Sequence, residues 1–145
     1  MNANHFIHIK SAKFPVLPGE DDELVNECMY GKALAQYIET ELKKRFYIVP
    51  FIGCEDWGWW VEIEGQPFSL GVCVYGASGL ANDQGMCVTV SQTIGRTWSW
   101  RKFKFIDKTD RVNKLFSELS DIFKSDKDIE IIGYPEGFPL DYPAG

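Results

Sequence analysis

The feature that most constrains the fold is a succession of β-type segments in the middle of the chain. These segments are rich in β-branched and aromatic residues, and most are separated by short, turn-like gaps. They are residues 46–52, 57–64, 67–75, 86–92 and 97–106. Strands that follow each other through short turns pair antiparallel, because a parallel pair needs a crossover of about a dozen residues. The sequence therefore predicts a mostly antiparallel sheet.

Two other segments carry apolar residues at helical spacing. The first is predicted to be capped by Asn26 and to end in a basic turn, where the helix dipole favours cations. Gly31 inside this helix is attributed to close packing against a strand. The second helix is predicted to be capped by Thr109. Its apolar stripe is Val112, Leu115, Phe116, Leu119, Ile122 and Phe123.

Strands are also predicted at 5–14 and 129–134, followed by an irregular Pro/Gly-rich tail at 135–145. No linker or internal repeat divides the chain. We predict a single α+β domain over residues 1–145. It has a mostly antiparallel sheet of about five to six strands, with two helices packed on one face.

The stretch CEDWGWWVEI, residues 54–63, is the most distinctive part of the sequence. Side chains alternate along a strand. The core face is predicted to carry Trp57, Trp59, Val61 and Ile63, which leaves Trp60 on an acidic face with Asp56, Glu62 and Glu64. Two alternatives stay open for Trp60. It is either exposed, as an interface anchor, or covered by the tail through Phe138 and Tyr142.

The net charge of −6 disfavours nucleic acid and anionic lipid as partners. The strand at 97–105, TWSWRKFKF, is a basic exception. Its lysines Lys102 and Lys104 are expected either to pair across the sheet with Glu62 and Glu64 or to form a platform for single-stranded nucleic acid. A bulge in this strand would put its aromatic residues inside.

Cysteine and histidine, the residue types that most often bind metals or act as nucleophile and base, are few in this sequence. The four cysteines form no CxxC pair, and the only histidines are His5 and His8. We predict no metal, no cofactor and no membrane span. The cysteines are interpreted as reduced, mostly buried thiols of a cytoplasmic protein. An enzyme site near Glu55, Asp56 and a histidine is the alternative.

Residues 17–63 resemble a group of small, uncharacterised bacterial proteins that look toxin-immunity-like. The shared features are an acidic loop, a Gly-x-x-Leu-Ala helix, a basic helix end and the string EDWGW. In this chain they include Asn26, Gly31, Leu34, Ala35 and Glu55 through Trp59. The resemblance implies no particular activity. A glycine usually follows the basic helix end in such proteins, and Phe46 stands there in this chain.

We therefore predict a non-enzymatic binding protein, in the best concrete form a cytoplasmic immunity protein that neutralises a basic bacterial toxin. An acidic surface speeds the encounter with a basic partner and sets its specificity. A free edge strand would also allow a homodimer. The predicted partner-binding residues are Glu20, Asp21, Asp22, Glu23, Asp56, Trp60, Glu62 and Glu64.

Overall fold

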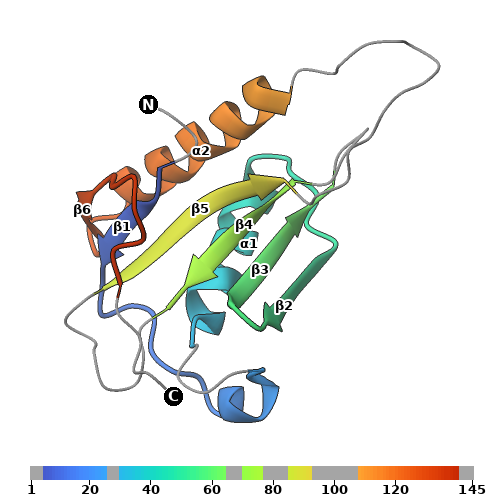
Figure 1. Cartoon of the computed structure of the whole chain (residues 1–145), viewed down its shortest axis with the longest axis vertical. Coiled ribbons are helices and arrows are strands. Elements are labelled where there is room, and N and C mark those ends of the chain that lie inside the picture. The colour runs from blue at the N-terminus through green and yellow to red at the C-terminus, as the bar shows by residue number, and fades with distance from the viewer. Residues whose placement is uncertain (1–4, 26–29, 65–69, 77–84, 93–107, 141–145) are drawn as a thin grey trace.

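A computed structural model describes residues 5–25, 30–64, 70–76, 85–92 and 108–140 (Figure 1). Six strands, two α-helices and one short 3₁₀ helix, η1, make up this part of the chain. In chain order they are β1 (Ile7–Lys10), η1 (Glu20–Glu23), α1 (Lys32–Lys44), β2 (Phe51–Glu55), β3 (Gly58–Ile63), β4 (Leu70–Tyr75), β5 (Met86–Gln92), α2 (Lys108–Ser125) and β6 (Glu130–Gly133).

The strands form one sheet in the order β2-β3-β4-β5-β1-β6, and every neighbouring pair is antiparallel. Helix α1 lies against β2 and β3, and α2 lies against β5 and β6 (Figure 1). Both helices contribute to the same core on one face of the sheet. The α+β prediction is confirmed.

The core follows the alternation of side chains along the strands. Ile7 and Ile9 of β1 and Trp59, Val61 and Ile63 of β3 are buried on the helix-covered face. The predicted apolar stripe of α2 is confirmed, because all six of its members are buried. Burying a large apolar side chain stabilises the fold by about 1.5–3 kcal/mol, so this layer supplies much of the driving force for folding.

The first helix begins later than predicted, at Lys32, and Asn26 lies outside the described residues. Gly31 is the N-cap of α1. A Cβ atom on Gly31 would lie 3.1 Å from the Trp59 ring and 3.4 Å from the Gly76 nitrogen. The expected close packing of Gly31 against strands is therefore correct, although Gly31 precedes the helix. Thr109 is the second residue of α2 and not its cap.

The predicted strand at 46–52 is correct only in its last two residues, because β2 runs from Phe51 to Glu55 and residues 46–50 are not in a strand. Helix α1 ends in a Schellman motif, in which the Tyr47 N–H donates to the Leu42 carbonyl at 3.0 Å and the Phe46 N–H to the Lys43 carbonyl at 3.1 Å. Phe46 has φ +71°, a left-handed conformation that costs a bulky residue roughly 1–2 kcal/mol. Strand β2 begins only after Pro50, which has no N–H to donate.

The tryptophan stretch is a hairpin and not a single strand. Glu55 pairs with Gly58, so Asp56 and Trp57 form the loop between β2 and β3. A Cβ atom on Gly58 would lie 2.6 Å from the Val74 carbonyl oxygen, so the close approach requires glycine. Alternation does not run through a turn. Trp57 therefore lies on the open face beside Trp60, and its predicted place in the core is wrong.

The second aromatic strand, 97–106, lies outside the described residues, as do Cys28 and Tyr142. The neighbours of β3 in the sheet are β2 and β4, and the residues directly opposite Glu62 are Phe51 and Gly71. The predicted pairing of Lys102 and Lys104 with Glu62 and Glu64 falls on residues outside the described ranges and stays a prediction.

Candidate functional site

Glu20, a predicted partner-binding residue, is a structural residue. Its side chain is 1% exposed. One carboxylate oxygen accepts hydrogen bonds from the Gly31 N–H at 2.8 Å and the Lys32 N–H at 3.1 Å, and the other accepts from the Leu17 N–H at 3.0 Å. A carboxylate in this position satisfies the orphan donors of a helix N-terminus. Glu20 therefore joins η1 to α1 and is not available to a partner.

The other three acids of η1 are exposed. Asp21 accepts a hydrogen bond from the Tyr30 hydroxyl, and Glu23 forms an ion pair with Lys32. These contacts hold η1 against the start of α1. Asp22 presents its full charge at the surface. The carboxylates of Asp21 and Glu23 are exposed as well, but each is partly engaged by its contact with Tyr30 or Lys32.

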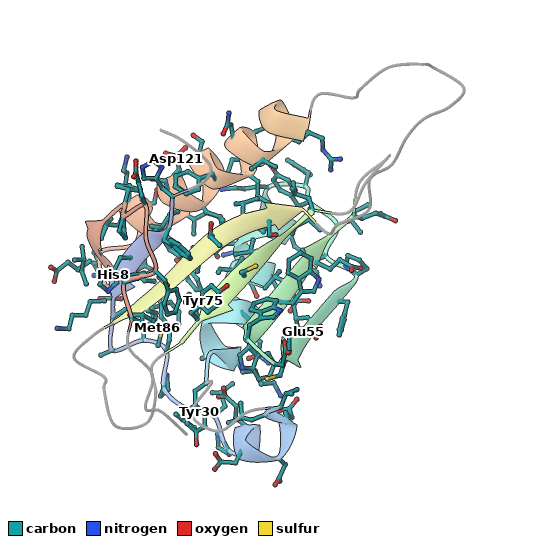
Figure 2. The ribbon with its side chains drawn as sticks, viewed as in Figure 1. His8, Tyr30, Glu55, Tyr75, Met86 and Asp121 are labelled. Carbon is teal, nitrogen blue, oxygen red and sulfur yellow. The ribbon has the colours of Figure 1, made fainter. Side chains whose placement is uncertain are left out.

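The fold brings η1 close to the hairpin between β2 and β3. Burial raises the pKa of the Cys54 thiol on β2, and the carboxylates of Glu20, Glu55 and Glu23 raise it further, whereas a hydrogen bond with the Val25 backbone lowers it. Figure 2 shows Glu55 at the end of β2 nearest η1. We call the exposed carboxylates gathered here the acidic end: Asp21, Asp22, Glu23, Glu55 and Asp56.

Glu62 and Glu64 do not belong to the acidic end. Glu62 lies four residues beyond Gly58 on β3, about 13 Å along the strand. Glu64 follows the strand, and its N–H donates to the Ile48 carbonyl at 2.9 Å. The eight predicted residues therefore do not form one surface. Asp21, Asp22 and Glu23 on η1 and Asp56 in the hairpin loop belong to two segments that lie near each other, whereas Glu62 and Glu64 lie at the opposite end of β3.

Trp60 is covered, so the alternative of an exposed anchor is wrong. Its side chain is 8% exposed and lies across Gly71, where a Cβ atom would be 2.2 Å from the ring. Trp57 packs against it with a centroid separation of 6.3 Å, and Tyr75 packs against Trp57 at 5.6 Å. Phe138 of the tail reaches Tyr75 at 4.8 Å. The tail therefore packs on this face through Tyr75, and Gly71 and Trp57 cover Trp60.

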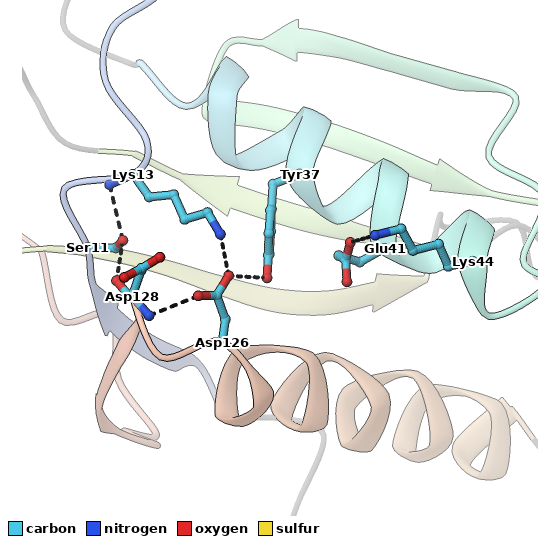
Figure 3. A network of polar contacts seen from close by, with 7 residues as sticks. All are labelled: Ser11, Lys13, Tyr37, Glu41, Lys44, Asp126 and Asp128. Carbon is cyan, nitrogen blue, oxygen red and sulfur yellow. Dashed lines mark hydrogen bonds and ion pairs between the residues drawn. The ribbon is translucent and has the colours of Figure 1, made fainter.

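A polar network ties the loop after β1 to both helices (Figure 3). Lys13 forms an ion pair with Asp126, and the Tyr37 hydroxyl donates to the same carboxylate at 2.8 Å. The Asp128 N–H donates to the other oxygen of Asp126 at 2.9 Å. These donors, with Lys13 first, hold the pKa of the Asp126 carboxyl at about 2, well below its usual range. The network stabilises the fold and offers no free reactive group.

Asp126→Asn is expected to reduce stability at neutral pH by about 1–2 kcal/mol. Because the folded pKa of Asp126 is depressed, its contribution is complete above about pH 5 and is lost as the pH falls toward about 2. Urea unfolding at pH 7 and pH 3 measures this, and the variant should lose less stability than the native chain between the two. Asp121→Asn, at an exposed site on α2, is the control. Equal pH dependence in all three chains would contradict the assignment.

The structure does not bring Glu55 or Asp56 together with either histidine. His8 lies on β1 and His5 just before it, and four strand spacings separate β1 from β2, about 19 Å. His5 instead lies 3.5 Å from the carboxylate of Glu136. A cavity of about 540 Å³ lies beside the loop after β1. Its described lining includes Lys10, Ser11 and Tyr30 but neither a histidine nor a carboxylate.

The thiols of Cys54, Cys73 and Cys87 are free, and those of Cys73 and Cys87 are buried. Burial raises the pKa of the Cys73 thiol to about 11 and also raises that of Cys87. These thiols stay protonated near neutral pH and are poor nucleophiles. Among the described residues, no group of three His, Cys, Asp or Glu side chains could hold a metal ion, and no helix is long and apolar enough to cross a membrane.

The sequence interpretation missed two surface residues. Phe46 stands almost wholly in solvent, at 96% exposure, whereas Trp60 is covered. The signal was the absence of a glycine after the basic helix end. Glu55 was considered only for catalysis, but it belongs to the acidic end. Comparison of the chain with protein-family profiles, with curated proteins and with solved structures finds no match.

Proposed function

We propose that this protein is a non-enzymatic binding protein that recognises a basic protein partner through its acidic end. The best concrete form is a cytoplasmic immunity protein that neutralises a bacterial toxin without a cofactor. The observation that carries the proposal is the meeting of exposed carboxylates from η1 with those of the hairpin between β2 and β3. These two segments are far apart in sequence.

The character of the acidic end supports a protein partner over a small ligand. Like charges that lie close together repel, so folding alone does not favour gathering them. A basic partner relieves this repulsion. The negative potential of the acidic end also steers such a partner to the site. Val25, 56% exposed, provides apolar surface at the same place. Basic toxin domains are partners of this kind, and occlusion of a toxin's active site needs only steric and electrostatic contact.

The chemistry of the cysteines supports the proposed cytoplasmic localisation. Cys54, Cys73 and Cys87 are free thiols, which suits a reducing compartment. In that compartment the proposed inhibitor would meet a toxin that acts in the cytoplasm.

The test compares the native chain with Asp22→Lys/Glu55→Lys. Tagged protein is used to capture partners from lysate of its own source cells, and the captured partner is then purified and assayed for toxicity with and without the native chain. The matched control is Asp121→Lys/Glu130→Lys, which makes the same charge change at exposed sites on α2 and β6.

We expect a basic protein in stoichiometric amount, held by the native and control chains, released by salt and lost by the acidic-end variant. The native chain should then abolish the toxicity of that protein at equimolar ratio. A partnerless protein, or a partner held equally by all three chains, would contradict the proposal.

A further inference from the structure

Strand β2 stands at one end of the sheet. It pairs with β3 on one side, and no other described strand pairs with its second edge. An edge of this kind presents backbone N–H and C=O groups to which an extended segment of another chain can add as a strand. Figure 1 shows β2 at the margin of the sheet, with η1 near the end of the hairpin that β2 begins.

Exposed apolar side chains occur in the segment that leads into β2 and at its first residue. They are Phe46 at 96%, Ile48 at 61% and Phe51 at 44% exposure. Phe46 is also held in a left-handed conformation that glycine adopts without strain. No burial within the described fold offsets this strain, which is consistent with a role for Phe46 outside the monomer. Clusters of exposed apolar residues mark interaction surfaces in soluble proteins.

The two ends of β2 differ in chemistry. Its first residue, Phe51, is apolar and exposed, and its last residue, Glu55, belongs to the acidic end. Glu62 is the charged residue opposite Phe51, and it lies on β3, on the inner side of β2. A segment lying along the outer edge would therefore meet carboxylates at one end and apolar surface at the other.

We propose that β2 receives an extended strand from the protein partner, with basic side chains beside Glu55 and Asp56 and apolar side chains beside Phe51 and Ile48. This inference rests on the proposed function and specifies how the partner is held. Main-chain hydrogen bonds supply affinity in this mode, and the side chains at the two ends supply direction and specificity.

The same pattern argues against a second copy of this chain as the occupant. A symmetric antiparallel pair of β2 strands centred on Gly53 would put Phe51 of one copy opposite Glu55 of the other, and would do so twice. A basic residue opposite Glu55 gives a favourable charge pair, which Phe51 of a second copy cannot supply.

The experiment uses the full chain and a synthetic peptide of about ten residues. The peptide has lysines in its amino-terminal half and valine and phenylalanine in its carboxy-terminal half, so that antiparallel binding matches both ends of β2. The matched peptide has the same side chains and N-methyl groups at alternate positions, which removes donors to the strand edge. Affinity is measured by calorimetry, and exchange of the β2 amides by NMR.

We expect the first peptide to slow exchange of the β2 amides and the N-methylated one to bind about tenfold more weakly. Phe51→Thr should weaken binding, and Ile132→Thr should not, because Ile132 has nearly the same exposure, 45%, on the opposite edge strand. Glu55→Lys should weaken binding in a salt-dependent way, and Asp121→Lys should not.

Phe46→Gly provides a readout that a purely structural residue would not give. Glycine relieves the left-handed strain, so the midpoint of urea unfolding should rise while peptide affinity falls. A variant that only disturbed the fold would lower both.

Several results would overturn the proposal. These are no binding at about 1 mM peptide, β2 amides already protected in the free monomer, or self-association that Phe51→Thr abolishes. Equal affinity for the two peptides would reject strand pairing and leave the acidic end as the binding surface. Asp22→Lys lies in η1 and tests the proposed function separately, since it changes the acidic end without touching the edge of β2.

Discussion

Glu20→Ala is expected to lower the free energy of unfolding by about 2–4 kcal/mol. The substitution removes the acceptor of three backbone N–H groups, at Leu17, Gly31 and Lys32. A buried donor left without a partner costs about 1–3 kcal/mol, and loss of a helix cap typically costs about 1 kcal/mol. Urea denaturation followed by circular dichroism measures the change, and hydrogen exchange should show fraying of the first turn of α1.

Asp22→Ala is the control for this variant. Asp22 is an exposed neighbour in the same 3₁₀ helix, so its loss should change stability by no more than about 0.5 kcal/mol. Glu20→Gln should fall between the two, because its amide oxygen accepts while its amino group faces backbone donors. A stable Glu20→Ala protein that had lost its partner would return Glu20 to the binding surface.

Trp60→Ala is expected to lower the free energy of unfolding by about 3 kcal/mol. The side chain is 8% exposed and packs on Gly71 and against Trp57, so its removal leaves a cavity on the open face of the sheet. Chemical denaturation gives the magnitude, and the near-ultraviolet dichroism of the aromatic residues should decrease. Under conditions where the variant is folded, its affinity for a partner should stay within about threefold of the native value.

Phe46→Ala is the control for Trp60→Ala. Its side chain is almost wholly exposed, and its loss should change stability by no more than about 0.5 kcal/mol. The pair separates a structural aromatic from a surface aromatic. If Trp60→Ala were as stable as Phe46→Ala and failed to bind, Trp60 would be the anchor and the packing described for it would not hold in solution.

The class of fold and most of the core could be predicted from the sequence. The apolar stripe of α2 was identified residue by residue, as were Trp59, Val61 and Ile63 on the core face of β3. Element boundaries were less predictable where two local rules compete. At Phe46 the chain leaves α1 through a left-handed residue, which is not expected of phenylalanine. At Asp56 and Trp57 a tight hairpin interrupts an alternation that continues in the sequence.

The candidate site was predictable in kind but not in its membership. An acidic surface followed from the composition of residues 20–23 and 55–56. Whether Glu20 lies on that surface depends on Gly31, eleven residues later, whose N–H needs an acceptor. Whether Trp60 is exposed depends on β4, where Gly71 leaves room for its ring. No periodicity encodes either relation.

The sequence by itself determined which face of each strand and helix is apolar, because side-chain direction follows from the backbone geometry of one segment. The tertiary structure alone decided the order β2-β3-β4-β5-β1-β6, the position of β2 at the edge of the described sheet and the meeting of η1 with the hairpin. These depend on which distant segments pack together. That choice is made by the free energy of the whole core and not by any local pattern.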